Sequence, residues 1–141
     1  MKSVAVRKNT YRLFRRLLRK MEPPPDISLS EWADCYRYLS SEASAEPGRW
    51  NTDRAPYQRE PMNAITDGKT RKVVLMWASQ TGKTDSLILN TIGYYMHYDP
   101  SPLMALQPTV EMGETFSKNR LAPMLRDTPV LRNLVDTKSR Y

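Results

Sequence analysis

The residues with the clearest potential for chemistry are 77–84, which read Trp-Ala-Ser-Gln-Thr-Gly-Lys-Thr. They match the phosphate-loop pattern except at its first position, where Trp77 replaces glycine. In such a loop the backbone N–H groups turn inward and the following helix N-terminus adds positive potential, so the loop can hold a polyphosphate. The pattern predicts that Gly82 allows close approach of the backbone, Lys83 reaches the β and γ phosphates, and the Thr84 hydroxyl binds Mg²⁺.

The surroundings of the loop strengthen this prediction, because the tripeptide Gly-Lys-Thr alone also arises by chance. The apolar run 72–77 is typical of a buried parallel strand, and helical periodicity follows over 87–97. A second apolar strand is predicted at 103–106, with a helix from 111 to about 121 after it. This order predicts an α/β fold with a parallel sheet and flanking helices.

Tyr57 and Gln58 lie about twenty residues before the loop and have side chains that suit adenine. A Gln amide can hydrogen-bond two atoms on the edge of the base, and a Tyr ring can stack on it. The same residues are commonplace at the start of a helix, which we predict over 60–65. From these residues alone, the helix start is the favoured interpretation.

Hydrolysis of ATP needs an acid at the end of a neighbouring strand and usually a second carboxylate to orient water. After the loop, no acid follows an apolar strand in that way, and the second predicted strand ends at Gln107. The sequence therefore predicts a nucleotide site whose catalytic carboxylates are unassigned.

The positive charge is concentrated at the N-terminus. The first 20 residues hold eight cations and no acid, whereas the remaining 121 carry 14 cations and 15 acids, so the net charge of +7 belongs to this arm. Helical spacing predicts a basic amphipathic helix within 1–22. Its apolar positions are Phe14, Leu17, Leu18 and Met21, and the basic positions between them include Arg15, Arg16 and Arg19. Its basic face could simply be solvated, could neutralise DNA phosphates, or could flank an apolar stripe that docks on a partner protein.

Between the arm and the predicted core lies a second segment, 23–56. Ser28 and Glu31 have capping-box spacing, which predicts a helix to about residue 40 with an apolar face formed by Trp32, Cys35, Tyr36 and Leu39. Residues 40–56 are rich in polar and turn-forming types and are predicted to be irregular. The predicted division is therefore 1–22, 23–56 and a core over 57–141.

Composition excludes several classes of protein. A single cysteine excludes an intramolecular disulfide framework and a cysteine-based zinc site. The absence of an apolar run of ~20 residues predicts a soluble, intracellular protein with no membrane partner.

Several short motifs together resemble the N-terminal part of the large terminase subunit of tailed bacteriophages, the lambda-type packaging motor. The matching stretches are 29–33, 47–50, 56–62, 80–84, 99–109 and 117–125. The resemblance implies a truncated P-loop NTPase fold of the additional-strand type, preceded by the helical arm. It also implies ATP and Mg²⁺ as cofactors, with Gln80, Thr81, Gly82, Lys83 and Thr84 in the phosphate site and Tyr57 and Gln58 at adenine.

The resemblance further implies a motor that drives double-stranded DNA into a procapsid in the bacterial host cytoplasm. The arm would engage the small terminase subunit, and only a complete protein would meet the procapsid portal. Members of the family are several times longer, so the Walker B acids, the coupling segment and the nuclease domain are expected to be missing here. A non-catalytic module that binds the small subunit or DNA is the alternative, and an unrelated P-loop kinase fragment is a weaker one.

Overall fold

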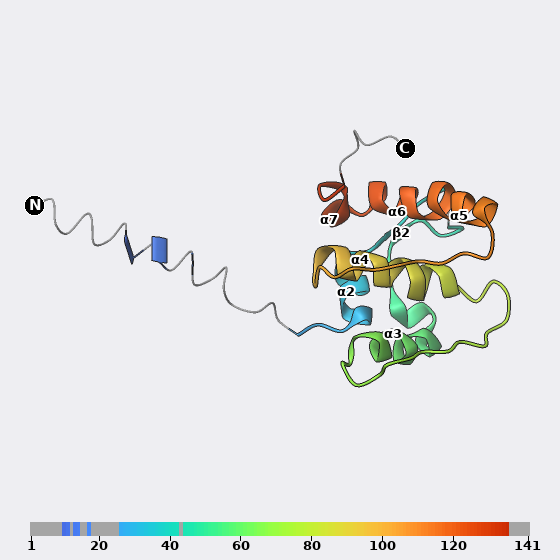
Figure 1. Cartoon of the computed structure of the whole chain (residues 1–141), viewed down its shortest axis with the longest axis horizontal. Helices are drawn as coiled ribbons and strands as arrows, with labels where there is room; N and C mark the ends of the chain where they lie inside the picture. The colour runs from blue at the N-terminus through green and yellow to red at the C-terminus, as the bar shows by residue number, and fades with distance from the viewer. Residues whose placement is uncertain (1–9, 12, 15–16, 18–25, 43, 136–141) are drawn as a thin grey trace, which may run out of the picture.

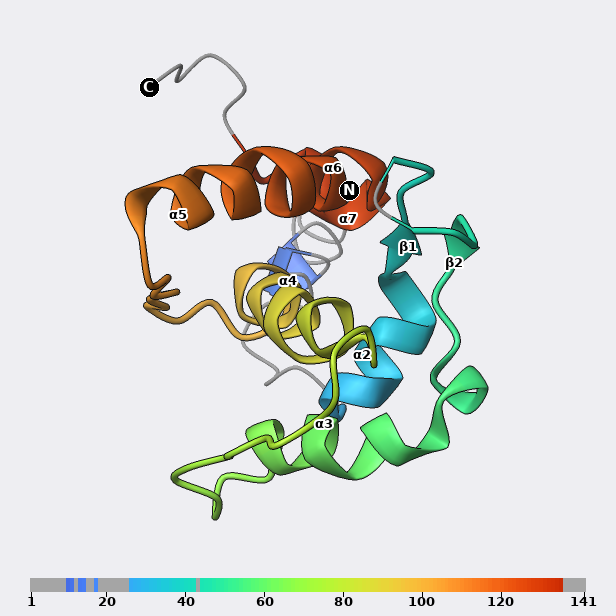
Figure 2. The ribbon, with the colours of Figure 1, turned by 90° about the vertical axis from the view of Figure 1, so that its right-hand side faces the viewer.

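A computed structural model of the chain describes residues 10–11, 13–14, 17, 26–42 and 44–135. The body is mainly helical and is arranged in three tiers, with α3 in the lowest, α2 and α4 in the middle, and α5, α6 and α7 in the highest (Figures 1 and 2). The bounds of these helices are α2 Leu29–Tyr36, α3 Arg59–Thr66, α4 Asn90–His97, α5 Val110–Phe116, α6 Ala122–Asp127 and α7 Pro129–Arg132.

Short elements extend or connect these helices. The π-helical stretch η3 (Thr84–Leu89) runs directly into α4, and η4 (Ser117–Leu121) joins α5 to α6. Two 3₁₀ turns, η1 (Thr52–Arg54) and η2 (Pro56–Gln58), lead into α3. The helices predicted over 60–65, 87–97 and 111–121 are therefore confirmed.

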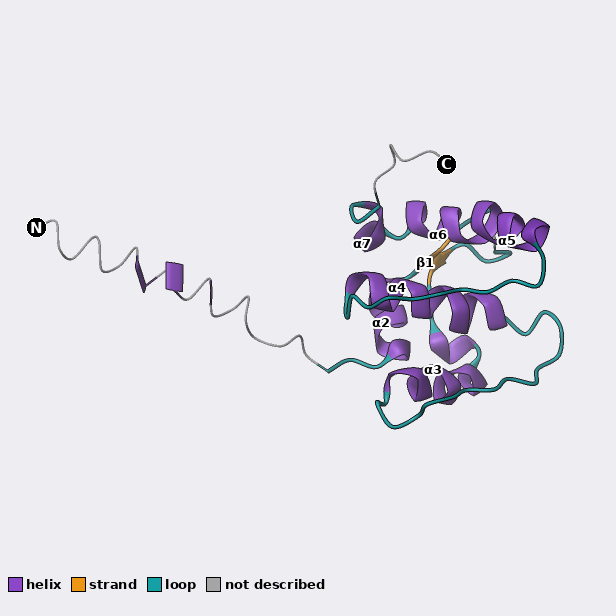
Figure 3. Ribbon diagram, viewed as in Figure 1, coloured by secondary structure: helices purple, strands orange, loops and turns teal. Residues whose placement is uncertain are grey.

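The helix α2 begins as predicted and ends earlier than predicted. Its capping box is present: the Glu31 N–H donates to the Ser28 hydroxyl, and the Ser28 N–H donates to the Glu31 carboxylate at 2.8 Å. The backbone turns extended at Arg37, because Tyr38–Leu39 (β1) pairs antiparallel with Gly48–Arg49 (β2). The strand β1 lies beneath α6 in Figure 3 and contacts it.

Trp32 lies at the centre of the core. It is fully buried, as are Leu29 of the same helix, Met62 of α3, Leu89 of η3 and Leu131 of α7. Gly93 on α4 lets the indole approach closely, since a Cβ there would lie 2.4 Å from a Trp32 ring carbon. Packing of this large ring therefore fixes the crossing of α2 and α4.

The predicted burial of Cys35 is wrong, because this side chain is exposed. The buried face of α2 is formed by Leu29, Trp32 and Ala33. At about 100° per residue, Cys35 points about 60° away from Trp32 on the side opposite to Ala33. The prediction took the apolar stripe to be wider than the surface that covers it.

Among the described residues the predicted parallel sheet is not formed. Segments 72–77 and 103–106 have no strand assignment, and no backbone–backbone hydrogen bond joins either to another segment. They run as long loops, one before η3 and one between α4 and α5 (Figure 3). An apolar run is insufficient for a strand, because a strand also needs a neighbour to accept and donate its ladder bonds.

The predicted arm is described only in part. Residues 10, 11, 13, 14 and 17 are helical, and the Phe14 and Leu17 side chains are exposed. Arg15, Arg16, Leu18, Arg19 and Met21 lie outside the described residues. In the part of the chain that can be searched, no helix has the length and apolar character needed to cross a membrane.

Candidate nucleotide site

The loop 78–83 has the tight backbone expected of an anion cradle. Gln80 and Gly82 both adopt the left-handed conformation, with φ of 61° and 79°. Gly82 is required for two reasons, since a side chain there would be strained and its Cβ would also lie 2.8 Å from the Gln58 amide nitrogen. The Thr81 hydroxyl closes the turn by donating to the Ala78 carbonyl at 3.0 Å.

The Lys83 ammonium folds back over this loop. It donates to the carbonyls of Trp77 and Ala78, both at 3.0 Å. Trp77, the departure from the standard pattern, therefore contributes a backbone acceptor to the loop. Its indole ring lies outside the turn and meets the Tyr57 ring edge to face, with centroids 5.4 Å apart.

Thr84 is the first residue of η3, so the loop ends at a helix N-terminus as the motif requires. The Ser86 N–H and hydroxyl both donate to the Gly82 carbonyl at 2.9 Å and fasten this first turn. Thr84 also lines an open pocket of about 350 Å³, together with residues on the loop before α5 and along α5 and η4: Gln107, Glu111, Met112, Thr115, Phe116 and Arg120. The pocket leaves space for a ligand beside the threonine.

Tyr57 and Gln58 are held against the loop by direct hydrogen bonds. The Tyr57 hydroxyl and the Gln58 amide nitrogen donate to the same acceptor, the Thr81 carbonyl, at 3.1 and 2.9 Å. Gln58 is buried, whereas the Tyr57 side chain is 57% exposed. Both residues thus support the loop, a role that the spacing in the sequence does not reveal.

A charged cluster lies directly behind the loop. The Asp85 carboxylate, next in sequence to Thr84, is 3.6 Å from the Arg37 guanidinium and 3.8 Å from that of Arg120. Burial raises the pKa of Asp85, and burial lowers the pKa of Arg37 to about 10, so Arg37 remains charged at neutral pH. These ion pairs join residues far apart in the chain, and no local sequence pattern predicts them.

His97 is a packing residue at the end of α4. Its Nδ1 accepts a hydrogen bond from the Trp32 indole at 3.1 Å, and burial lowers its pKa. The Tyr94 ring packs against the rings of Tyr95 and Tyr98, with centroids 5.2 Å apart in each pair. Within the described ranges, no group of three or more His, Cys, Asp or Glu side chains could hold a metal ion.

The amino-acid sequence of this chain is similar to those of phage terminase large subunits. Residues 44–141 match the ATPase domain of the phage terminase large subunit gpA. The chain is 32% identical over 114 residues to the terminase large subunit of Escherichia phage lambda and 31% identical over 111 residues to that of Enterobacteria phage P21. These alignments cover 81% and 79% of this chain, which spans only 17% of the length of each relative. No solved structure matches the chain.

Proposed function

This chain belongs to the family of phage terminase large subunit gpA ATPase domains, and from this membership we propose that it binds ATP with Mg²⁺ as part of a DNA-packaging motor. The observation that carries the proposal is the Gly82-Lys83-Thr84 turn at the start of a helix, held from behind by Gln58. Family membership implies use of a nucleotide, and this turn is where the chain offers a cradle for phosphates.

In this proposal each residue of the loop contacts a different part of the phosphates or the metal. The backbone of Gln80, Thr81 and Gly82 surrounds the phosphates, and Lys83 exchanges its two carbonyl partners for phosphate oxygens. Thr84 presents its hydroxyl to Mg²⁺ at the pocket, where the metal would neutralise phosphate charge. A charge-assisted bond to phosphate is stronger than one to a neutral carbonyl, so the exchange favours binding.

Tyr57 and Gln58 would bind the adenine base. The exposed Tyr57 ring can stack on the base while its hydroxyl stays on the loop. The Gln58 amide nitrogen already serves Thr81, so its carbonyl oxygen is the atom left for the base. Both side chains would then couple recognition of adenine to the shape of the phosphate loop.

We also propose that 72–77 and 103–106 are the first two strands of an NTPase sheet, within a core over 57–141. Both are apolar and extended, and they line one groove of about 340 Å³ with η3 and α4. The preceding units over 1–22 and 23–56 would be the arm and a helical support. This arrangement keeps the strand, loop and helix order of a P-loop NTPase.

The wider role of the motor is proposed from the family. The large subunit would work with the small terminase subunit through the arm, act on double-stranded DNA, meet the portal only in a complete protein, and operate in the host cytoplasm. The second candidate is a non-catalytic module that binds the small terminase subunit or DNA, which the eight cations and no acid of the first 20 residues favour.

Calorimetric titration of the purified chain with MgATP tests the proposal. We expect binding that falls more than tenfold in Lys83→Ala and is unchanged in the matched control Lys72→Ala, an exposed lysine before the loop. A steady-state phosphate-release assay then separates the motor from the non-catalytic module. Wild-type chain that binds no MgATP, or Lys83→Ala that binds normally, would contradict nucleotide binding at this loop.

A further inference from the structure

An acidic residue follows the phosphate loop directly. Asp85 is next to Thr84 in the first turn of η3, and its side chain is only 21% exposed. The N–H groups of such a turn attract an anion, whereas a carboxylate close to them repels it. At the nucleotide site proposed above, the charge of Asp85 would therefore weaken the binding of phosphates unless a cation cancels it.

Arg37 is the buried cation beside this carboxylate. Its guanidinium lies 3.6 Å from Asp85 Oδ1, and its side chain is 2% exposed. A pair that is so little exposed is screened weakly by salt and solvent, so the two charges act strongly on each other. Arg120 lies 3.8 Å from Asp85 Oδ2, but its side chain is 44% exposed and solvent screens its charge more. Arg37 is therefore the main counter-charge of Asp85.

Several elements of the fold hold Arg37 in place. It donates to the Asn90 side chain of α4 at 3.1 Å, to the Thr128 hydroxyl between α6 and α7 at 3.5 Å, and to the Tyr38 carbonyl of β1. None of these three bonds involves Asp85. They fix the guanidinium whether or not the carboxylate is charged, so the position of Arg37 is a property of the fold around it.

We propose that Arg37 cancels the charge of Asp85 at the phosphate loop and thereby permits tight binding of the nucleotide; this proposal rests on the nucleotide site proposed above. Arg37 does not touch the nucleotide. It acts through Asp85, by making the electrostatic potential at the start of η3 more positive. Two arginines and one aspartate give this cluster a net charge of +1, and without Arg37 the sum is 0 and attracts phosphates less.

This role gives the segment before the predicted core a part in nucleotide binding. Arg37 ends α2 and belongs to the segment 23–56, whereas Asp85 belongs to the predicted core over 57–141. The affinity for nucleotide would therefore depend on how α2 and β1 pack on α4. The segment would be an electrostatic component of the site as well as a helical support.

Calorimetric titrations of single and double variants with MgATP test this role. Arg37→Gln should bind roughly tenfold more weakly, because it leaves a carboxylate without its main counter-charge near the phosphates. Asp85→Asn should bind as tightly as the wild type or more tightly, because it removes the repulsion. The double variant should return to within about twofold of the wild type, since the cluster regains its charge of +1.

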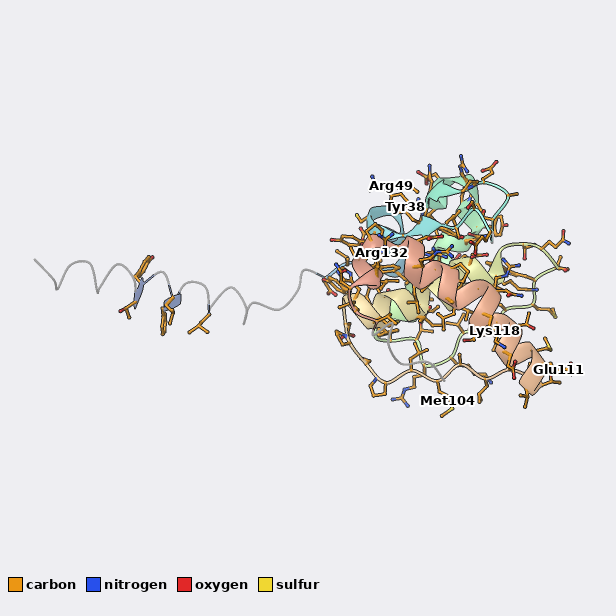
Figure 4. All side chains as sticks on the ribbon, turned by 90° about the horizontal axis from the view of Figure 1, so that it is seen from above. Tyr38, Arg49, Met104, Glu111, Lys118 and Arg132 are labelled. Atoms are coloured by element: carbon orange, nitrogen blue, oxygen red, sulfur yellow. The ribbon has the colours of Figure 1, made fainter. Side chains whose placement is uncertain are left out.

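Arg49→Gln is the matched control. Arg49, labelled in Figure 4, is an arginine of the same segment, and it donates to the backbone carbonyls of Asp34 and Cys35 at 3.0 and 3.4 Å. Its removal leaves the charges of Arg37 and Asp85 as they are. The affinity of this variant for MgATP should therefore equal that of the wild type.

A purely structural role of the ion pair predicts a different pattern. If Asp85 only anchors η3 to Arg37, Asp85→Asn loses affinity as Arg37→Gln does, and the double variant does not recover. That pattern, or an unchanged affinity in Arg37→Gln, would overturn the proposal. Circular dichroism shows whether each variant is folded. If Arg37→Gln is unfolded, Asp85→Asn alone decides, because a loss of affinity in this variant contradicts the repulsion.

Arg37→Lys separates charge from hydrogen bonding. It keeps the charge and loses part of the bonding of the guanidinium, so stability should fall while affinity for MgATP stays within about twofold of the wild type. A loss as large as that of Arg37→Gln would contradict the proposal. Failure of the nucleotide site itself is distinguishable, because Lys83→Ala would then bind MgATP normally or the wild-type chain would not bind it.

Discussion

The helical core around Trp32 and the extended segments 72–77 and 103–106 have similar apolar character and opposite surroundings. In the core, Trp32, Met62 and Leu89 are fully buried by contacts from different helices. In the extended segments, Met76 is 97% exposed, and Met104, which is labelled at the edge of the body in Figure 4, is 81% exposed. An apolar pattern therefore becomes a helix or strand only where another part of the described chain packs or pairs with it.

Segment 72–77 has one covered face and one bare face, whereas all four residues of 103–106 are exposed. Leu75 and Trp77 pack against the core, while the alternate residues Val74 and Met76 are exposed. This alternation is that of a strand in a sheet with one layer of helices in place. The phosphate loop lies at the join of the two regions, since it leaves 72–77 and enters η3.

The largest expected effect comes from breaking the packed region. Trp32→Ala should lower the free energy of unfolding by about 3–5 kcal/mol, because it removes a fully buried ring and its hydrogen bond to His97. Urea unfolding followed by circular dichroism measures the change. A loss below about 1 kcal/mol would show that this ring does not organise the core.

Gly93→Ala should destabilise the chain by about 1–3 kcal/mol, because the new Cβ would lie 2.4 Å from the Trp32 ring. In an ordinary helix the same substitution stabilises by about 1 kcal/mol, so the sign is diagnostic. The double variant with Trp32→Phe, a smaller ring, should recover part of the loss. A stabilising Gly93→Ala would refute the close packing of α2 on α4.

The acid dependence of stability should report His97. Burial lowers its pKa in the folded state, so folding favours the neutral ring, and the unfolded chain binds the proton first as pH falls below about 6.5. This contribution to stability is present above pH ~6.5 and is lost as pH falls through the folded pKa. His97→Gln should flatten this part of the curve of unfolding free energy against pH, and an unchanged slope would contradict a half-buried neutral ring.

The smallest effect is expected on the bare face. Met76→Lys should change the free energy of unfolding by less than about 0.5 kcal/mol, since this side chain is almost fully exposed. It should also reduce binding of a hydrophobic dye, because the segment contributes to an exposed apolar surface. A large loss of stability would mean that the outward face of 72–77 is covered in solution.

The same comparison explains which predictions the sequence supports. The capping box predicts helix α2, and the apolar periodicity predicts the helix through Leu87 and Ile92, because both signals are local in the sequence. The parallel sheet is not formed among the described residues, since the ladder bonds of 72–77 depend on segments that pair from elsewhere. The end of α2 was misplaced because the pairing of Tyr38 with Arg49 is not visible in either segment alone.

Part of the candidate site can likewise be predicted from local sequence, and part depends on the tertiary fold. The Gly82-Lys83-Thr84 turn is a contiguous motif, so the sequence predicts its position and the helix that follows it. The support that Gln58 gives to Thr81, and the pairing of Arg37 with Asp85, join residues 23 and 48 positions apart. Such contacts follow from the tertiary fold, and nothing in the residue types singles out the partner.

Hydrogen exchange of the backbone amides, with and without MgATP, tests the central claim most directly. The account predicts that MgATP slows exchange over 78–85 and at Tyr57 and Gln58, while β1 and β2 are unaffected. In the nucleotide-free chain 72–77 should exchange rapidly, because its amides have no backbone partner among the described residues. Unchanged exchange over 78–85 at a saturating concentration of MgATP would contradict nucleotide binding at this loop.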